Sequence, residues 1–248
     1  ASNYAPCSGI AGLNNDAEGV NKAVLTRPTP ERVLVDTGII ANAPRRLFAA
    51  GLGDALSTWF EARACKNSGA RTMARGNVSN TGLMMARRCY DLLMEKGRDA
   101  LAAVERHEVT PALEDVVEAT IYLSGLGFEN GGLAAAHAVN DGFAQEPQAH
   151  GMYHGEKVAF GTLVQLVLEK APQEELEQVL AFLRDTGLPR TLAQLGVKEI
   201  VPETLKKVAE AAVVPTQSTK NLRADTTAQE VYDAILEADR IGRDYLAR

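Results

Sequence analysis

The feature that most restricts the fold of this chain is the helical spacing of its apolar residues from Pro44 to the C-terminus. Apolar side chains recur three and four positions apart, which is the pattern of a helix with one buried face. The sequence predicts successive helices over residues 44–66, 70–96, 111–127, 131–144, 154–170 and 173–186. The last of these is expected to end at Gly187, because Pro189 follows directly beyond it.

Three further helices are predicted in the remainder of the chain. A short one covers TLAQLGV at residues 191–197, and Pro202 opens a longer one. Thr227 and Glu230 have the spacing of a capping box, so the terminal helix is expected to begin there. Helices joined by short connections predict that the chain from about residue 45 to the end forms a helical bundle.

Strand character is confined to residues 1–40. The runs KAVL and VLVDT are rich in β-branched residues, and Pro28 and Pro30 lie between them. The run VLVDT at residues 33–37 is predicted to be a buried strand. The expected fold class is therefore mainly α, with a short β segment at the N-terminus.

Composition narrows the classes of function. The chain has 248 residues with a formal net charge of −6, and acidic and basic residues are mixed along it, so nucleic acid is not an expected partner. The apolar stretches are too short and interrupted to span a bilayer, so no membrane partner is expected. Three cysteines without CxxC spacing indicate a reduced, cytoplasmic protein. No Gly-rich phosphate loop of the GxGxxG or GxxxxGKS type occurs in the sequence.

Three separated residues have the character of one open metal site: Asp54, His137 and His154. Each lies in a Gly-containing segment, namely GLGDALSTWFEA, GGLAAAHAVNDGF and MYHGEKVAFG. One carboxylate and two imidazoles make three protein ligands, the set typical of a catalytic divalent metal with a fourth position left for water or substrate. The pattern indicates metal-assisted catalysis.

Each of these residues also has a structural interpretation. Asp54 could be a helix N-cap, or a carboxylate held inside a long helix and directed into a cleft. His137 could be a core histidine bonded to a backbone carbonyl, and His154 could be a turn residue at a helix start. His150 is a further ligand or an exposed loop residue, and His107 is expected at the surface.

Read together, three segments resemble glycerol dehydrogenases of the iron-containing (group III) alcohol dehydrogenase superfamily. The segments are GLGDALSTWFEA, FENGGLAAAHAVNDGF and YHGEKVAFGTLVQLVL, and the similarity runs from residue 1 to the terminal YLAR. In that family an α/β nucleotide-binding domain precedes an all-helical metal domain, and the active site lies in the cleft between them. The resemblance implies that residues 1–44 are a remnant of the nucleotide-binding domain and residues 45–248 the helical metal-binding catalytic domain.

The resemblance also implies roles for individual residues. By motif, Asp54, His137 and His154 fall on the family's metal ligands, with zinc expected and iron as the alternative. The family's ASTDAPTSALSVIY segment falls on ASNYAPCSGIAGLN here, so Ser8 and Ile10 are expected to line the NAD cofactor.

Two positions depart from the family pattern. Tyr4 stands where the TDAP segment has an aspartate, and Asn140 stands where the HAIHNGF pattern has a second histidine. Both positions face the reaction centre in the relatives. The metal site is therefore expected to be intact and the polyol-recognising surroundings altered.

The implied function is the metal-dependent, NAD-linked oxidation of glycerol, or a related small vicinal diol, to the hydroxyketone. The metal would hold the alcohol oxygen as a Lewis acid, and hydride would pass to the nicotinamide. Roughly the first third of such an enzyme is absent from this sequence, so either a missing N-terminal domain or self-association into a homo-oligomer is expected. The alternatives are a lyase of the dehydroquinate synthase type and a non-catalytic, truncated helical metal-binding fragment.

Overall fold

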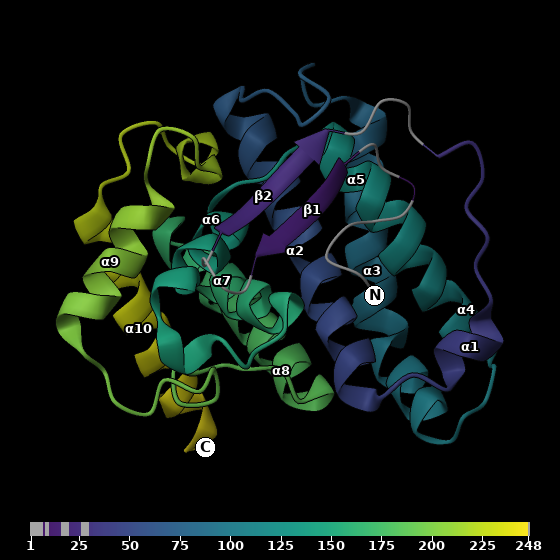
Figure 1. Cartoon of the computed structure of the whole chain (residues 1–248). Coiled ribbons are helices and arrows are strands. Elements are labelled where there is room, and N and C mark those ends of the chain that lie inside the picture. Colours follow the sequence, from purple (N-terminus) through teal and green to yellow (C-terminus); the bar gives the residue numbers. More distant parts are fainter. Residues whose placement is uncertain (1–6, 8–9, 16–19, 26–29, 248) are drawn as a thin grey trace.

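The computed structural model describes residue 7, residues 10–15 and 20–25, and residues 30–247. Helices dominate this part of the chain, as the apolar spacing predicts (Figure 1). The helices are α1 (Thr37–Ala41), α2 (Arg45–Ser68), α3 (Asn80–Glu105), α4 (Pro111–Glu118), α5 (Ser124–Gly131), α6 (Ala135–Gly142), α7 (His154–Leu168), α8 (Gln173–Thr186), α9 (Pro202–Ala212) and α10 (Ala228–Leu246). A π-helical turn at Ala119–Leu123 joins α4 to α5.

Helix α2 lies at the centre of the bundle, where it packs against α3, α5 and α7. Its buried residues run almost without interruption from Phe48 to Cys65, so they face every side of the helix. A helix that is buried all round belongs to the interior of a protein. A charged side chain on α2 is consequently held among buried neighbours and needs a polar partner there.

The other helices bring α6 and α7 to the same region. Helix α6 packs against α7 and α9, and α10 packs across α7 and α9. On the other side of α2, helix α3 contacts α4, α5 and α8. Helices α2, α6 and α7 therefore lie next to one another, and they carry the three candidate ligands.

The predicted β segment is an antiparallel pair of strands, β1 (Ile10–Asn15) and β2 (Val20–Leu25), with Ile10 opposite Leu25. The predicted run KAVL lies in β2.

The prediction of a buried strand at VLVDT is wrong. Residues 31–36 form no strand, and Leu34 is 98% exposed. Asp36 instead caps α1, because its carboxylate accepts hydrogen bonds from the amides of Gly38 and Ile39. A strand is stabilised by a hydrogen-bonded neighbour and a buried face, and within the described residues this segment has neither.

The predicted helix over residues 70–96 is displaced, since α3 runs from Asn80 to Glu105, and one predicted helix is absent. Residues 70–79 form a loop, and α3 begins only after Ser79, whose hydroxyl accepts the amide hydrogen of Gly82. The segment TLAQLGV makes turns rather than a helix. Helix α8 ends at Gly187 with φ of +76°, as predicted, and the capping box of Thr227 with Glu230 is present.

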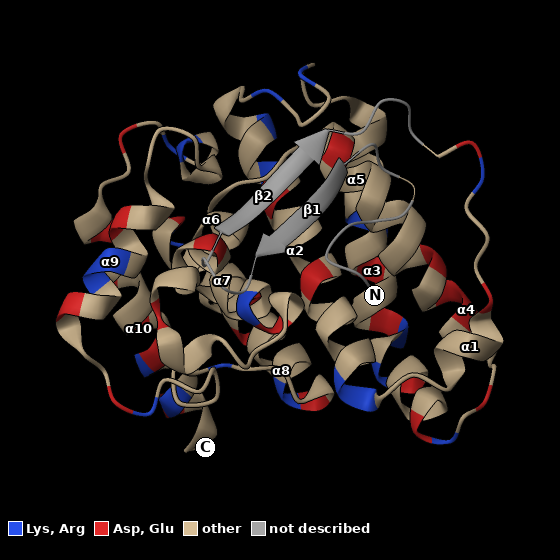
Figure 2. Cartoon of the chain, viewed as in Figure 1, with Lys and Arg blue, Asp and Glu red and all other residues tan. Residues whose placement is uncertain are grey.

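Charges of both signs are spread over the helices, and in the view of Figure 2 neither sign gathers over one group of them. Within the described residues, no helix is both long enough and apolar enough to cross a bilayer. Cys7, Cys65 and Cys89 are free thiols, as the absence of CxxC spacing predicts. Burial raises the pKa of the Cys65 thiol to about 12, so this thiol is protonated at neutral pH.

Candidate metal centre

Asp54 lies inside α2, more than two turns after the helix begins at Arg45. The N-cap interpretation is therefore wrong, and the alternative of a carboxylate directed inward from a long helix is correct. Two glycines set its position relative to α7. A Cβ atom on Gly53 would lie 2.5 Å from the carbonyl oxygen of Gly155, and one on Gly155 would lie 1.8 Å from that of Ala50. Because neither residue has a side chain, the two helices approach closely beside Asp54.

His154 is the first residue of α7, as predicted. Glu156 fixes this helix start, because its carboxylate accepts the amide hydrogen of Tyr153 at 2.7 Å. Arg46 of α2 donates two hydrogen bonds to the same carboxylate, at 2.6 and 2.8 Å. A bidentate arginine–carboxylate pair is specific in geometry, so it ties the start of α7 to α2.

His137 lies in the first turn of α6, directly after a constrained loop. Gly132 has φ of +93°, and a Cβ atom there would lie 2.7 Å from the sulfur of Cys65. The carbonyl of Leu133 accepts from the Asn221 amide at 2.8 Å, and that of Ala134 accepts from the Ser218 hydroxyl at 2.6 Å. These contacts hold the chain where it enters the helix that carries His137.

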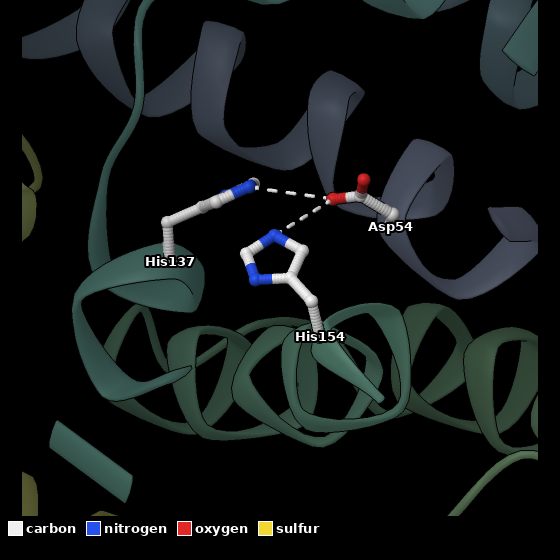
Figure 3. A group of neighbouring side chains, drawn as sticks. All are labelled: Asp54, His137 and His154. Atoms are coloured by element: carbon white, nitrogen blue, oxygen red, sulfur yellow. Dashed lines mark ion pairs between the residues drawn. The ribbon is translucent and has the colours of Figure 1, made fainter. Parts of the chain in front are cut away.

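The three side chains point toward one another from α2, α6 and α7 (Figure 3). The Nε2 atoms of His137 and His154 lie 3.4 and 3.5 Å from the same oxygen, Oδ1 of Asp54. One ligand atom from each residue lies within 4.8 Å of the other two. The side chains are only 13–22% exposed. Among the described residues, this is the group of His, Cys, Asp and Glu side chains with the spacing of a metal site.

The charges of these groups depend on one another. Burial alone raises the pKa of Asp54, but the neighbouring imidazoles of His154 and His137 hold that pKa well below its usual range. Burial lowers the pKa of His137, whereas the carboxylates of Glu61 and Asp54 outweigh burial and raise that pKa well above 6.5. Asp54 is therefore an anionic carboxylate at neutral pH.

Glu61 is the residue at this site that sequence reasoning missed. It is fully buried in α2, and its Oε2 lies 2.6 Å from Nδ1 of His137. The imidazole of His137 therefore contacts the carboxylate of Glu61, where the core-histidine interpretation expects a backbone carbonyl. The sequence held one signal, since Glu61 follows Asp54 by seven positions in an apolar helix and two such positions share a helix face.

Comparison with known proteins gives the family. No family model matches the chain. The glycerol dehydrogenase of Escherichia coli O6:H1 is 53% identical over 246 residues, which are 99% of this chain and 67% of that relative. That of Pseudomonas putida is 49% identical over 246 residues, with the same two coverages. The chain belongs to the glycerol dehydrogenase family.

Solved structures of the family agree. A probable glycerol dehydrogenase from Sinorhizobium meliloti matches with a TM-score of 0.91 at 41% identity, covering 96% of this chain and 67% of that one. Glycerol dehydrogenase from Schizosaccharomyces pombe matches with a TM-score of 0.92 at 37% identity, covering 97% of this chain and 61% of that one. This chain thus spans about two thirds of the length of its glycerol dehydrogenase relatives, and their names favour an oxidoreductase over a lyase.

The other histidines lie apart from the metal centre. His150 is exposed, and its Nε2 contacts the carbonyl of Ala144 at 3.0 Å. His107 is also exposed, with its Nδ1 3.4 Å from the carbonyl of Ala41. Both observations agree with the loop and surface interpretations of these residues.

Asn140, the position that departs from the family motif, is fully buried one turn after His137 in α6. Its Nδ2 donates to Asp141 at 3.0 Å, which leaves its Oδ1 buried without a partner in the described part of the chain. Tyr4 and Ser8 lie outside the described residues. The backbone of Ile10 begins β1, and its side chain is outside the description as well.

Proposed function

We propose that this chain carries the metal-binding part of an NAD-linked dehydrogenase that oxidises glycerol, or a related vicinal diol, to the hydroxyketone. The observation behind the proposal is the convergence of Asp54, His137 and His154 from three helices in a member of the glycerol dehydrogenase family. The role of these three residues is to hold one divalent ion.

The ligand spacing supports this role. Tetrahedral zinc with bonds of about 2.0–2.1 Å places its ligand atoms about 3.3 Å apart. The two Nε2 atoms lie 3.4 and 3.5 Å from Oδ1 of Asp54, which suits ligands of one ion and is long for a hydrogen bond. Nε2 of His154 is buried and has no hydrogen-bond partner among the described residues. A buried polar atom without a partner is costly, and a metal bond removes that cost.

We propose zinc as the ion, because one carboxylate and two neutral imidazoles form a donor set that suits zinc, with ferrous iron as the alternative. When bound, zinc supplies a Lewis acid that lowers the pKa of an alcohol hydroxyl. Asp54 is the one anionic ligand among the three, so its charge of −1 neutralises only half of the +2 charge of the ion. The remaining positive charge favours a substrate oxygen that has lost its proton. The buried small residues of α6 leave the three ligand side chains only 13–22% exposed, which limits the access of water to the site.

Hydride from the carbon of the alcohol requires an acceptor, and we propose NAD, bound in part at Ser8 and Ile10. We propose a small polyol as substrate because neighbouring hydroxyls can both bind one ion. Asn140, as a neutral amide in place of the family's second imidazole, is proposed to modify substrate selection.

The test is an assay of NAD reduction with glycerol and 1,2-propanediol, combined with elemental analysis of the bound metal. The chain is assayed alone and after fusion behind the N-terminal third of the Escherichia coli relative, because the relatives are longer than this chain. The fused protein is expected to hold one zinc ion and to reduce NAD. The substitution His137→Ala should remove both the zinc and the activity.

The matched control is His107→Ala, since His107 is an exposed histidine outside the metal centre. This variant should keep the zinc and the turnover of the unchanged fusion. A His137→Ala protein that still oxidises a diol with bound metal would refute the assignment. Zinc binding without turnover by the fusion would instead support the non-catalytic alternative.

A further inference from the structure

We propose that Glu61 is a positioning residue that selects the metal-binding form of His137 and fixes the helix start on which His137 lies. The inference rests on the proposed metal site and adds to it a residue that binds no metal itself. Glu61 is fully buried in α2, while its partners lie in and just before α6. One carboxylate thus links two of the helices that form the site.

The first oxygen of Glu61 caps α6. The residue at the N-cap position is Ala134, which has no side chain that could accept a hydrogen bond. Oε1 of Glu61 takes that place, accepting the amide hydrogens of Ala134 at 2.8 Å and of His137 at 3.0 Å. The amide of Ala136, which lies between them, donates to Oε1 of Gln165 from α7 at 3.0 Å. The first amides of a helix need such acceptors, and a negative charge is favourable there.

The second oxygen of Glu61 acts on the imidazole. Oε2 lies 2.6 Å from Nδ1 of His137. The other oxygen of this carboxylate accepts two backbone amide hydrogens, so we infer that Oε2 is an acceptor as well and that the proton of the contact is on Nδ1. A neutral imidazole with its proton on Nδ1 has its lone pair on Nε2, and Nε2 is the atom that faces Asp54. A partner on the remote nitrogen of a ligating histidine fixes both the tautomer and the ring orientation.

The near-isosteric variant Glu61→Gln separates this role from simple packing. If the NH₂ group of the introduced amide faces His137, it donates to Nδ1 and drives the imidazole proton to Nε2, the atom needed for the metal. If the NH₂ group faces the backbone amides of Ala134 and His137 instead, hydrogen-bond donors lie opposite donors. The two amides then lose their acceptor, and the start of α6 is no longer capped. Neither orientation satisfies all three contacts that the carboxylate makes.

The experiment measures zinc affinity of the full chain by competition with a chelator of known affinity. Glu61→Gln is expected to weaken zinc binding by about 10–100-fold, the range typical for loss of such a partner of a metal ligand. The matched control is Gln165→Leu, which removes the neighbouring cap on α6 and leaves the imidazole contact intact. This control should weaken zinc binding less than Glu61→Gln does, because it removes one contact of the α6 start and keeps the partner of the imidazole. Equal losses in both variants would show that only helix capping matters and would overturn the role of Glu61 in selecting the form of His137.

A second measurement does not depend on how the variant folds. In the unchanged zinc-free chain with ¹⁵N-labelled histidine, at a pH high enough for His137 to be neutral, nuclear magnetic resonance is expected to show the proton of His137 on Nδ1. A proton on Nε2 would overturn the role of Glu61. The two hypotheses can fail separately: no zinc binding by the unchanged chain refutes the metal site, whereas tight binding that Glu61→Gln leaves unchanged refutes the role of Glu61 alone.

Discussion

Two glycines decide how closely α2 and α7 approach, and each is adjacent to a proposed metal ligand. Gly53 precedes Asp54, and Gly155 follows His154. The site is therefore formed at the point where the backbones of the two helices touch. The three ligands alone do not specify this geometry, because it also requires the absence of side chains beside them.

The substitution Gly155→Ala should destabilise the chain. The added methyl group would lie 1.8 Å from the carbonyl oxygen of Ala50, so the backbone of one helix must shift. Overpacking of this kind costs about 1–3 kcal/mol. Urea denaturation should show this loss in the free energy of unfolding, and zinc affinity should fall because the shift separates His154 from Asp54.

Gly76→Ala is the control for this prediction, because a Cβ atom at Gly76 meets nothing within 4 Å. It should leave both stability and zinc affinity unchanged. Equal effects of the two substitutions would contradict the account of the contact between α2 and α7.

At the scale of the elements, acidic side chains fix the starts of several helices, α6, α7 and α10 among them. Glu61 caps α6 from a distance, Glu156 caps α7, and Glu230 caps α10. The pKa of Glu230 is lowered from 4.5 to about 2, chiefly because its carboxylate accepts a hydrogen bond from the backbone amide of Thr227. Hydrogen bonds from Arg223 and from the Thr227 hydroxyl lower this pKa further. Such a carboxylate stabilises the folded state only while it is ionised.

This capping box predicts a pH dependence. Because the pKa of Glu230 is lower in the folded chain, its contribution to stability is complete above about pH 4.5 and disappears as the pH falls to about 2. The difference in the free energy of unfolding between the unchanged chain and Glu230→Gln should shrink over that interval. Thr227→Ser keeps the hydroxyl and should keep the dependence. A difference that is constant or grows on acidification would contradict the assignment.

At the scale of the whole molecule, the sequence predicted the helical bundle because helix periodicity and capping signals are local. It failed at VLVDT, because whether an apolar run becomes a strand depends on a partner elsewhere in the chain. It did not single out Glu61, since the role of that residue exists only when α2 meets α6. The structural interpretation of Asp54 as an N-cap was wrong for a similar reason, because the helix begins well before it.

The convergence of Asp54, His137 and His154 was predicted from three segments read together, and no single segment was sufficient. The division at residue 44, the NAD contacts of Ser8 and Ile10, a homo-oligomer and a cytoplasmic location stay predictions from the sequence. They concern parts of the protein, or its surroundings, beyond the helices that form the proposed metal centre.

The most direct test of the central claim is anomalous diffraction at the zinc absorption edge, from crystals of the chain grown with one equivalent of zinc. The account predicts a single strong peak about 2.0–2.2 Å from a carboxylate oxygen of Asp54 and from Nε2 of both His137 and His154. A peak bound by other residues, or no peak between these three side chains at full zinc loading, would contradict it.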